Sequence, residues 1–248
     1  MIPIKLKSLI LKSIVTLLFT GMVSCNTSEK KKELGQTYPD IHVVGAMKDA
    51  MWKGELYSKI DLDTISNKNG LYGLGPQTQL TGELLIIDGK CYVSKVVSDS
   101  TMTVQETYKT GAPFFVFGNV KEWKSVKIPE TITDMKALET FVDEQSKEIK
   151  RPFAFKVSGT VSDATIHIQN LPPGSKVSSP QEAHVGQTDY TLQDEAVDIV
   201  GFFSTEHQTV FTHHDTFMHL HLITQDRSKM GHLDHAIFEN ITLYLPMK

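Results

Sequence analysis

The sequence predicts an α/β protein of the α+β type, in which strands outnumber helices. Residues 151–248 contain one strand-like run after another, rich in β-branched and aromatic residues and separated by polar turns. In the first half, an Asp-Gly pair at 88–89 joins two similar runs, which is a strong signal for a β-hairpin. One long helical pattern occupies 131–150, with apolar residues recurring at helical spacing.

The segments before the hairpin are predicted to be short. We expect a strand at 41–44, a short helix at 46–52 whose Met47, Met51 and Trp52 are buried, a helical turn at 60–66 and a glycine-punctuated loop at 72–76. The expected strands of the first half are 79–87, 90–97, 113–120 and 123–127. Those of the second half are 153–159, 164–169, 188–192, 197–203, 217–224, 232–238 and 241–245. We expect the helix at 131–150, capped by Thr133-Asp134, to cover one face of the sheet.

The composition is ordinary for a globular protein and argues against a nucleic-acid partner. The 248 residues are 40% hydrophobic and 22% charged, and the formal net charge is −4. Such an acidic balance offers no basic surface for phosphates. Of the two cysteines, Cys25 is expected to be modified, which leaves Cys91 without a partner for an internal disulfide.

The amino terminus is typical of an exported protein. In residues 1–24, lysines precede an apolar run that is too short to span a membrane comfortably. Ser24-Cys25 resembles the cleavage box of bacterial lipoproteins, so we expect Cys25 to become the lipidated first residue. A plain secretory signal or a short anchor is the alternative. Residues 25–40 are polar and are expected to tether the domain to a lipid anchor in the cell envelope.

Three histidines in the second half have the spacing of a metal site. His219 and His221 alternate with leucines in a predicted strand, so both point to the same face. A polar segment ending in glycine separates them from His232, which a returning strand brings alongside. Three imidazoles with an open fourth position are the usual ligands of a catalytic zinc. Ordinary surface histidines are the alternative interpretation of the same pattern.

Glu83 is the candidate catalytic carboxylate. By alternation it shares a strand face with the apolar Leu85 and Ile87. A carboxylate among apolar neighbours is costly to bury without a function or a partner, whereas a strand at the edge of the sheet would leave it in solvent.

Short motifs along most of the chain occur in the order found in a known family. They are Gly82-Glu83, Asp88-Gly89-Lys90-Cys91-Tyr92, Pro113-Phe114, Gly201-Phe202, His219-Leu220-His221, Asp226-Arg227 and Gly231-His232. In this order the sequence resembles the acetolactate decarboxylases over residues 43–245. The histidine motif and its flanking residues are the most specific part of the resemblance.

The resemblance implies a two-part fold. The first half, 41–150, would be a mixed β-sheet subdomain with a covering helix and would carry Glu83. The second half, 151–248, would be a mainly antiparallel, barrel-like β subdomain and would carry the three histidines. Members of the family are typically dimers, so a homodimer is implied as well.

The resemblance also implies a chemistry. Zinc would be held by His219, His221 and His232, and Glu83 would be the active-site glutamate. In the family, the metal binds oxygens of 2-acetolactate and stabilises the enediolate left by the loss of carbon dioxide, and the product is acetoin. The substrate is thus a small hydroxy or keto acid.

The sequence departs from the family pattern at three substrate contacts. His167 stands where the family has an arginine that grips the substrate carboxylate, and a neutral imidazole is no bidentate partner for a carboxylate. Pro76 replaces a threonine, and the chain ends before a second glutamate of the family.

These observations give one leading hypothesis and two rivals. The leading one is a zinc-dependent carboxy-lyase that resembles acetolactate decarboxylase and is exported on a lipid anchor. The first rival is a metal-containing binding module of the cell envelope that kept the site and lost catalysis. The second is a cupin-type enzyme, which requires a glutamate shortly after His-x-His, where this chain has Thr224 and Gln225.

Overall fold

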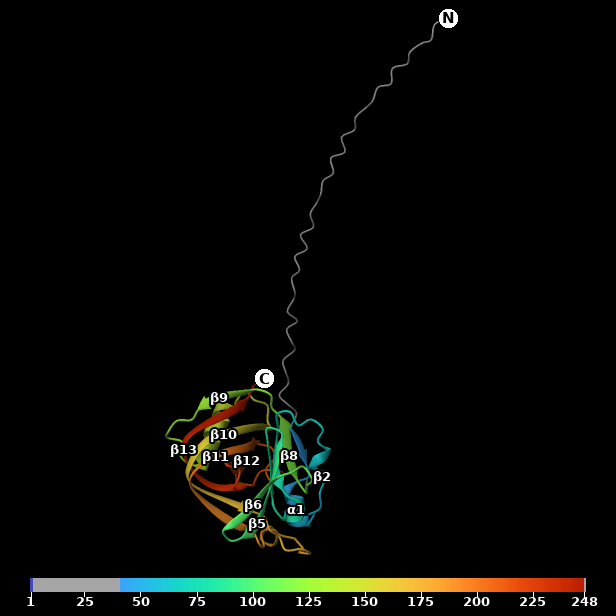
Figure 1. Ribbon diagram of the computed structural model, residues 1–248, viewed down its shortest axis with the longest axis vertical. Coiled ribbons are helices and arrows are strands. Elements are labelled where there is room, and N and C mark those ends of the chain that lie inside the picture. The colour runs from blue at the N-terminus through green and yellow to red at the C-terminus, as the bar shows by residue number, and fades with distance from the viewer. Residues whose placement is uncertain (2–40, 248) are drawn as a thin grey trace. The chain divides into compact units, whose positions relative to one another are not determined.

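The computed structural model describes Met1 and residues 41–247, and those residues from 41 onward fold around two large β-sheets (Figure 1). The predicted export signal beyond Met1, Cys25 and the tether lie outside the described residues. Within the described part, no helix is long and apolar enough to cross a membrane.

The first sheet has six strands, and every ladder in it is antiparallel. In sheet order they are β1 (His42–Val44), β8 (Phe115–Asn119), β3 (Leu71–Pro76), β4 (Glu83–Ile87), β5 (Lys90–Ser98) and β6 (Thr101–Glu106). The expectation of a mixed sheet is therefore wrong for this half. Tight turns join β4, β5 and β6, and a tight turn can connect only antiparallel neighbours. The predicted hairpin is confirmed, with positive φ at both Asp88 and Gly89.

The predicted loop at 72–76 is wrong, because this segment is strand β3 near the middle of the first sheet. All six of its residues are buried. Its glycines allow close packing against β8: a Cβ on Gly73 would lie 2.7 Å from the Phe115 ring, and one on Gly75 would lie 2.5 Å from the Phe114 carbonyl oxygen. Glycine therefore marks a crowded strand here and not a turn.

Short elements surround this sheet. They are helix α1 (Met47–Lys53), strand β2 (Ile60–Asp61), the 3-10 helices η1 (Leu62–Thr64) and η2 (Thr78–Leu80), and strand β7 (Gly111–Ala112), which pairs with β2. The predicted short helix is confirmed in α1, and Met47 and Met51 are buried. Trp52 is 50% exposed, so its prediction as a buried residue is wrong. The predicted helical turn at 60–66 is a short strand followed by η1.

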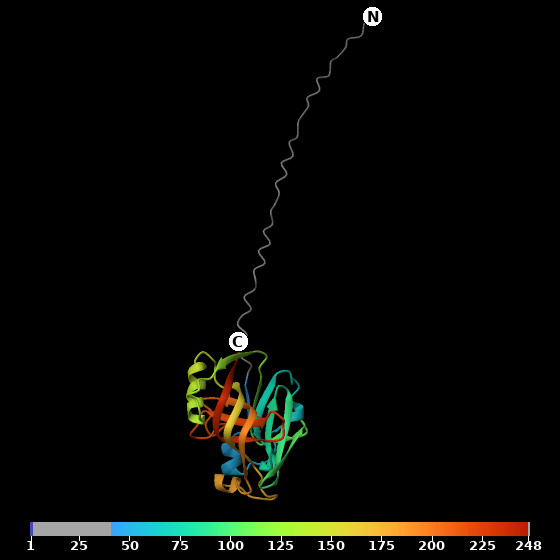
Figure 2. The ribbon, with the colours of Figure 1, turned by 60° about the vertical axis from the view of Figure 1, so that its left-hand side comes forward.

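The second sheet is built on three long strands. In order it contains β10 (Phe153–Ile168), β11 (Thr188–Phe203), β12 (Met218–Thr224), β13 (Met230–Pro246) and β9 (Trp123–Lys127). A further pairing of β10 with β13 closes four of them into the expected antiparallel, barrel-like arrangement (Figure 2). Each long strand replaces two shorter predicted ones. Strand β9 comes from the first half of the sequence and pairs with β13.

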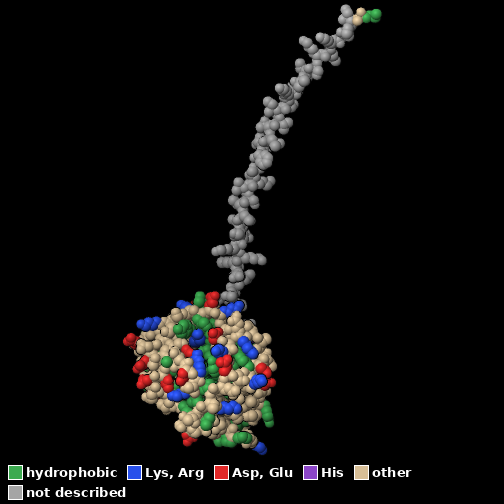
Figure 3. Space-filling model, in the orientation of Figure 1, with side chains coloured by type: hydrophobic (Ala, Val, Ile, Leu, Met, Phe, Trp, Pro, Cys, Tyr) green, Lys and Arg blue, Asp and Glu red, His purple; other side chains and the backbone are tan. Residues whose placement is uncertain are grey.

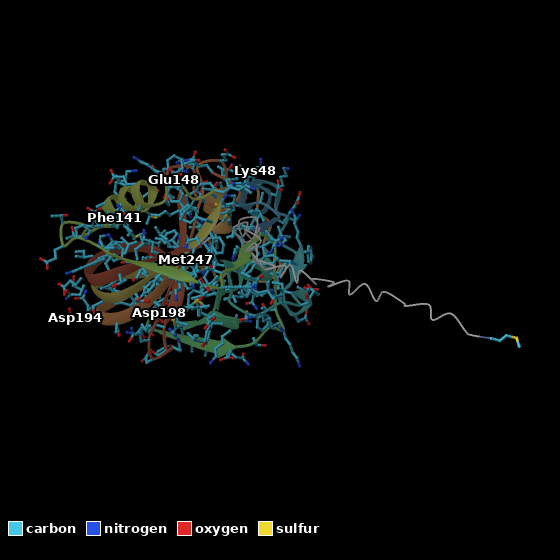
Figure 4. The ribbon with its side chains drawn as sticks, turned by 90° about the horizontal axis from the view of Figure 1, so that it is seen from above. Lys48, Phe141, Glu148, Asp194, Asp198 and Met247 are labelled. Carbon is cyan, nitrogen blue, oxygen red and sulfur yellow. The ribbon has the colours of Figure 1, made fainter. Side chains whose placement is uncertain are left out.

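Helix α2 (Met135–Gln145) packs on the barrel and is shorter than the predicted 131–150. The side chain of Asp134 caps its first turn by accepting a hydrogen bond from the Ala137 N–H at 2.8 Å. Leu138 and Val142 are fully buried in the barrel core. In the view of Figure 4, α2, marked by Phe141, and α1, marked by Lys48, lie toward one edge of the folded domain, and Asp194 and Asp198 of β11 lie toward the other. A one-turn helix, α3 (Pro180–Ala183), contacts α1.

The two sheets pack against each other through a shared apolar layer. Tyr72, Leu74 and Leu85 of the first sheet lie in one cluster with Phe202 and Ile223 of the second. Burial of this layer holds β4 against the strands of the barrel. The surface shown in Figure 3 has acidic and basic side chains interspersed, without a basic patch of the kind that binds nucleic acid.

Candidate metal centre

The three predicted histidines lie together at the seam between the sheets. His219 and His221 project from β12, and the ladder pairs His221 directly with His232 of β13. Leu220 and Leu222 point to the opposite face, into the barrel core. The ring centroids are 4.9 to 5.5 Å apart, and the three side chains are almost completely buried.

The arrangement fits a metal ion. One nitrogen from each ring lies within 4.8 Å of the other two, and His219 Nε2 is 3.1 Å from His232 Nδ1. Tetrahedral nitrogen ligands at zinc lie about 3.3 Å apart, given zinc–nitrogen bonds of about 2.0–2.1 Å. His221 Nε2 is buried and has no hydrogen-bond partner among the described residues. A buried nitrogen of this kind is unfavourable unless a metal ion or a proton donor satisfies it.

The environment keeps these imidazoles neutral. Burial lowers the pKa of His221 to about 3 and lowers the pKa values of His219 and His232 well below the ordinary value. Nearby histidines add to the effect, because each disfavours a positive charge on the others. Neutral rings present the lone pairs that a metal requires.

Glu83 lies beside this cluster, where β4 meets β12. Its side chain is almost fully buried, and its Oε2 is 3.6 Å from His221 Nε2. Burial raises the pKa of Glu83 to about 8, although the nearby His167 and a hydrogen bond from the Gln169 N–H, at 3.2 Å from Oε1, both lower it. Burial therefore favours the protonated form of this carboxyl group.

His167 lies on the neighbouring strand and is held by an acid that the sequence interpretation missed. The ladder pairs His167 of β10 with His232, and the two ring centroids are 4.6 Å apart. His167 Nδ1 is 2.7 and 2.9 Å from the two carboxylate oxygens of Asp234. Burial lowers the pKa of His167, but this hydrogen bond and the charge of Asp234 outweigh burial, so the pKa is raised.

A cavity of about 140 Å³ connects these groups. It is lined by Met47, Met51, Pro76, Glu83, Phe114, His167, Gln169, His184, Gln187, His213, His219, His232 and Asp234. Gln169 and His184 were not predicted to have a role. The described residues that line this cavity include no arginine or lysine. The cavity therefore combines a candidate metal centre, a buried carboxyl group whose pKa is raised and several further hydrogen-bonding groups.

Comparison with known proteins places the chain in a family. The model of the family named alpha-acetolactate decarboxylase matches residues 43–247, most of the chain. The chain belongs to the alpha-acetolactate decarboxylase family. The earlier resemblance to this family is thereby confirmed. Among curated proteins, no match to the chain was found.

Solved structures share the fold. The alpha-acetolactate decarboxylase of Bacillus subtilis strain 168 is 24% identical, with a TM-score of 0.69 over 84% of this chain and 85% of that one. The acetolactate decarboxylase of Bacillus subtilis subspecies spizizenii is 23% identical, with a TM-score of 0.66 over 84% and 86%. A Staphylococcus aureus protein described as similar to alpha-acetolactate decarboxylase is 17% identical, with a TM-score of 0.67 over 82% and 84%. At identities of 17–24%, these similarities show a shared fold. The fold belongs to the α+β class that the sequence predicted.

Proposed function

We propose that this protein is a metal-dependent decarboxylase that converts 2-acetolactate to acetoin, or a closely related 2-hydroxy-3-keto acid to the corresponding decarboxylated product. Membership of the acetolactate decarboxylase family supports a carboxy-lyase. The observation that carries the proposal is the buried Glu83 carboxyl group, whose Oε2 lies 3.6 Å from His221 Nε2, next to three buried imidazoles with metal-ligand spacing. Decarboxylation leaves negative charge on carbon, and the site combines a cation position with a proton donor.

The ligands of the proposed metal are His219, His221 and His232, and zinc is the ion that best matches three imidazoles with an open position. When bound, it supplies a Lewis acid that favours the negative charge that develops on the substrate oxygens. The tight burial of the three rings keeps water away from the side of the site that they occupy.

Glu83 is the proposed proton donor. The bond between the substrate carbon and its carboxylate breaks, carbon dioxide leaves, and the electron pair remains on that carbon in conjugation with the neighbouring carbonyl. A proton from Glu83 then completes the product. The Gln169 N–H holds Oε1 of Glu83, so the carboxyl group has a fixed position in the cavity wall.

Gln169 is a proposed contact for the substrate hydroxyl group. Its side chain is buried, and its Oε1 has no hydrogen-bond partner in the described part of the chain. The side chain also lines the cavity that contains Glu83. A hydroxyl group of the substrate would satisfy this acceptor, which favours a hydroxy acid over a simple keto acid.

One observation favours a second candidate function, a metal-containing binding module without catalysis. The family pattern has an arginine where His167 lies, and no described arginine or lysine lines the cavity. The charge of a protonated His167 is already balanced by Asp234. Such a protein would hold zinc and a small hydroxy acid without turning the acid over.

The experiment that separates the two is an acetoin assay. Purified, zinc-loaded protein is incubated with racemic 2-acetolactate, and acetoin is measured against the spontaneous rate in buffer. We expect acetoin to form faster than that spontaneous rate. If only one enantiomer reacts, the enzyme should convert at most half of the added substrate. Retention of zinc and of the acid with acetoin at the buffer rate would instead identify a binding module.

We also propose, from the sequence alone, that the protein is exported and held in the cell envelope by lipid on Cys25. A homodimer is proposed from the family resemblance. Both proposals concern features outside the described residues or beyond a single chain. Replacement of Cys25 by serine should move the protein from the membrane fraction to the soluble fraction, and unchanged fractionation would rule out this anchor.

A further inference from the structure

We propose that His167, Asp234 and His232 form a second site for a divalent cation, which shares the His232 imidazole with the three-histidine centre. The described residues contain a second group with metal-ligand geometry, and it consists of these three side chains. Their ligand atoms lie within 4.8 Å of one another, as in the first group. Two imidazoles and one carboxylate are a common ligand set for zinc.

The two nitrogens of His232 face different partners. Nδ1 is 3.1 Å from Nε2 of His219, inside the three-histidine centre. Nε2, on the other side of the ring, is 3.8 Å from Oδ1 of Asp234. One imidazole therefore presents a ligand atom to each site. With ions in both sites, the ring would release its remaining N–H proton to water and would offer one nitrogen to each ion.

The strand register positions the two imidazoles of the second site, because His167 of β10 pairs directly with His232 of β13. Asp234 lies at the β-bulge that follows, between the paired residues Leu233 and His235. His167 Nδ1 is 2.7 Å from Asp234 Oδ2, a hydrogen bond that a metal ion bound to both atoms would replace. His167 is 7% exposed, so its ring is already ordered before any ion binds.

Asp234 also provides a route to solvent. Its side chain is 36% exposed, in contrast to the buried ligands of the first site. It lines both the cavity that contains Glu83 and a neighbouring cavity of about 290 Å³ between α2 and the end of the barrel. His213 and His232 line both cavities too. An ion on Asp234 would thus keep open positions for water or for substrate oxygens.

The second ion would supply the charge that the cavity lacks. The His167–Asp234 pair has no net charge when His167 is protonated and a net negative charge when it is neutral, so it is a poor partner for a carboxylate. A divalent cation there would make the same place positive, where the family pattern has an arginine. This consequence for substrate binding rests on the proposed decarboxylase function, but the metal site itself does not.

The test is the number of zinc ions bound per chain. Metal-free protein is saturated with Zn²⁺, passed through a desalting column and analysed for zinc and protein. We expect a ratio near two for the wild type and near one for both Asp234→Asn and His167→Gln. Asp189→Asn is the matched control, because Asp189 lies opposite His167 on β11 and is not a proposed ligand, so this variant should keep a ratio near two.

A spectroscopic readout distinguishes the shared imidazole from a loosely bound surface ion. With Co²⁺ in both sites, coupling through His232 should weaken the EPR signal per cobalt relative to Asp234→Asn. A wild-type zinc ratio near one, or a ratio near two that survives both substitutions, would overturn the proposal. Two zinc ions without acetoin would overturn only the decarboxylase function, and acetoin with a single zinc would overturn only the second site.

Discussion

The proton on Glu83 is the single-residue property on which the proposed chemistry depends most. Glutamine at this position keeps the shape and the hydrogen bond from Gln169 but has no acidic proton. We expect Glu83→Gln to lower kcat by roughly 10²–10⁴-fold, the usual contribution of a general acid. Zinc content should not change, because Glu83 is not a proposed ligand. Activity within a few-fold of the wild type would show that the proton comes from elsewhere.

Gly231 controls how closely the ligand strand approaches its neighbour. A Cβ at this position would lie 2.5 Å from the carbonyl oxygen of His167, so alanine would push β13 away from β10 next to His232. We expect Gly231→Ala to weaken zinc binding by roughly 10–100-fold, as changes next to a ligand commonly do. Competition with a chromophoric chelator measures this, and wild-type affinity in the variant would contradict the account.

For single residues, the alternation of side chains along a strand made part of the site predictable. His219 and His221 alternate with leucines, and the glycine before His232 indicated the return of the chain, so these three positions followed from the sequence. Asp234 has the same alternation relative to His232, but an aspartate near a histidine is too common to indicate a pair. Gln169 was missed because its contact with Glu83 is made by a backbone N–H, which leaves no trace in residue type.

At the scale of elements, α2 anchors the segment 204–217, which places His213 beside the metal centre. Glu139 on α2 is almost fully buried and accepts hydrogen bonds from the Thr216 hydroxyl and, at 2.8 Å, from the Phe217 N–H. The ring of His213 lies 5.2 Å from that of His232. A carboxylate on a helix thus positions the segment that closes the site.

The ionised form of Glu139 should account for this anchoring. Burial raises its pKa, but hydrogen bonds from Lys136, Thr216 and Phe217 outweigh burial and lower it. Because the pKa of Glu139 is lower in the folded state, its ionised form stabilises the fold at pH values above the unfolded-state pKa of about 4.5. This stabilisation is lost as the pH falls through the folded-state pKa of Glu139. We expect Glu139→Gln to cost about 1.5–3 kcal/mol at pH 7, the range for hydrogen bonds to a charged group.

Urea unfolding of the metal-free protein at pH 7 and pH 3.5 measures that difference. The gap in unfolding free energy between the wild type and Glu139→Gln should narrow at the lower pH. Lys136→Gln is a useful control, since Lys136 is mostly exposed and its loss should cost much less. A gap of equal size at both pH values would show that the charge on Glu139 is not what holds the segment.

Element boundaries were the least predictable part of the fold. The long strands β10, β11 and β13 were each expected as two pieces, because polar or glycine residues interrupt their apolar patterns where the strands reach beyond the core. Strand β3 was expected as a loop, because glycines such as Gly73 and Gly75 are more typical of turns than of strand interiors. Only the neighbouring strand, which the sequence does not specify, decides between the two.

At the scale of the whole domain, the site exists because two sheets are packed together. Glu83 comes from the first sheet and the three histidines from the second, and the apolar layer between the sheets holds them in contact. Strand β9, from the first half of the sequence, also pairs with β13 from the second half. The α+β class followed from the strand patterns, but the antiparallel order of the first sheet did not, because strand order depends on long-range contacts.

A metal that bridges β12 and β13 should also stabilise the fold. At a free zinc concentration of about 100 times Kd, binding adds about 2.7 kcal/mol. For a domain of this size, we expect a Tm higher by roughly 5–10 °C than after treatment with a chelator. His221→Ala removes a ligand of the three-histidine centre only, so the chelator should lower the Tm of this variant by less than it lowers the Tm of the wild type. An equal chelator effect in this variant would place the stabilising metal elsewhere.

The most direct test of the central claim is acetoin formation by one sample of protein before metal removal, after it and after zinc is restored. If the three histidines hold the metal that works with Glu83, acetoin formation from 2-acetolactate should fall to the buffer rate on chelation and return with about one equivalent of zinc or more. Acetoin formation that continues unchanged in the metal-free protein, or that is absent in all three states, would contradict the account.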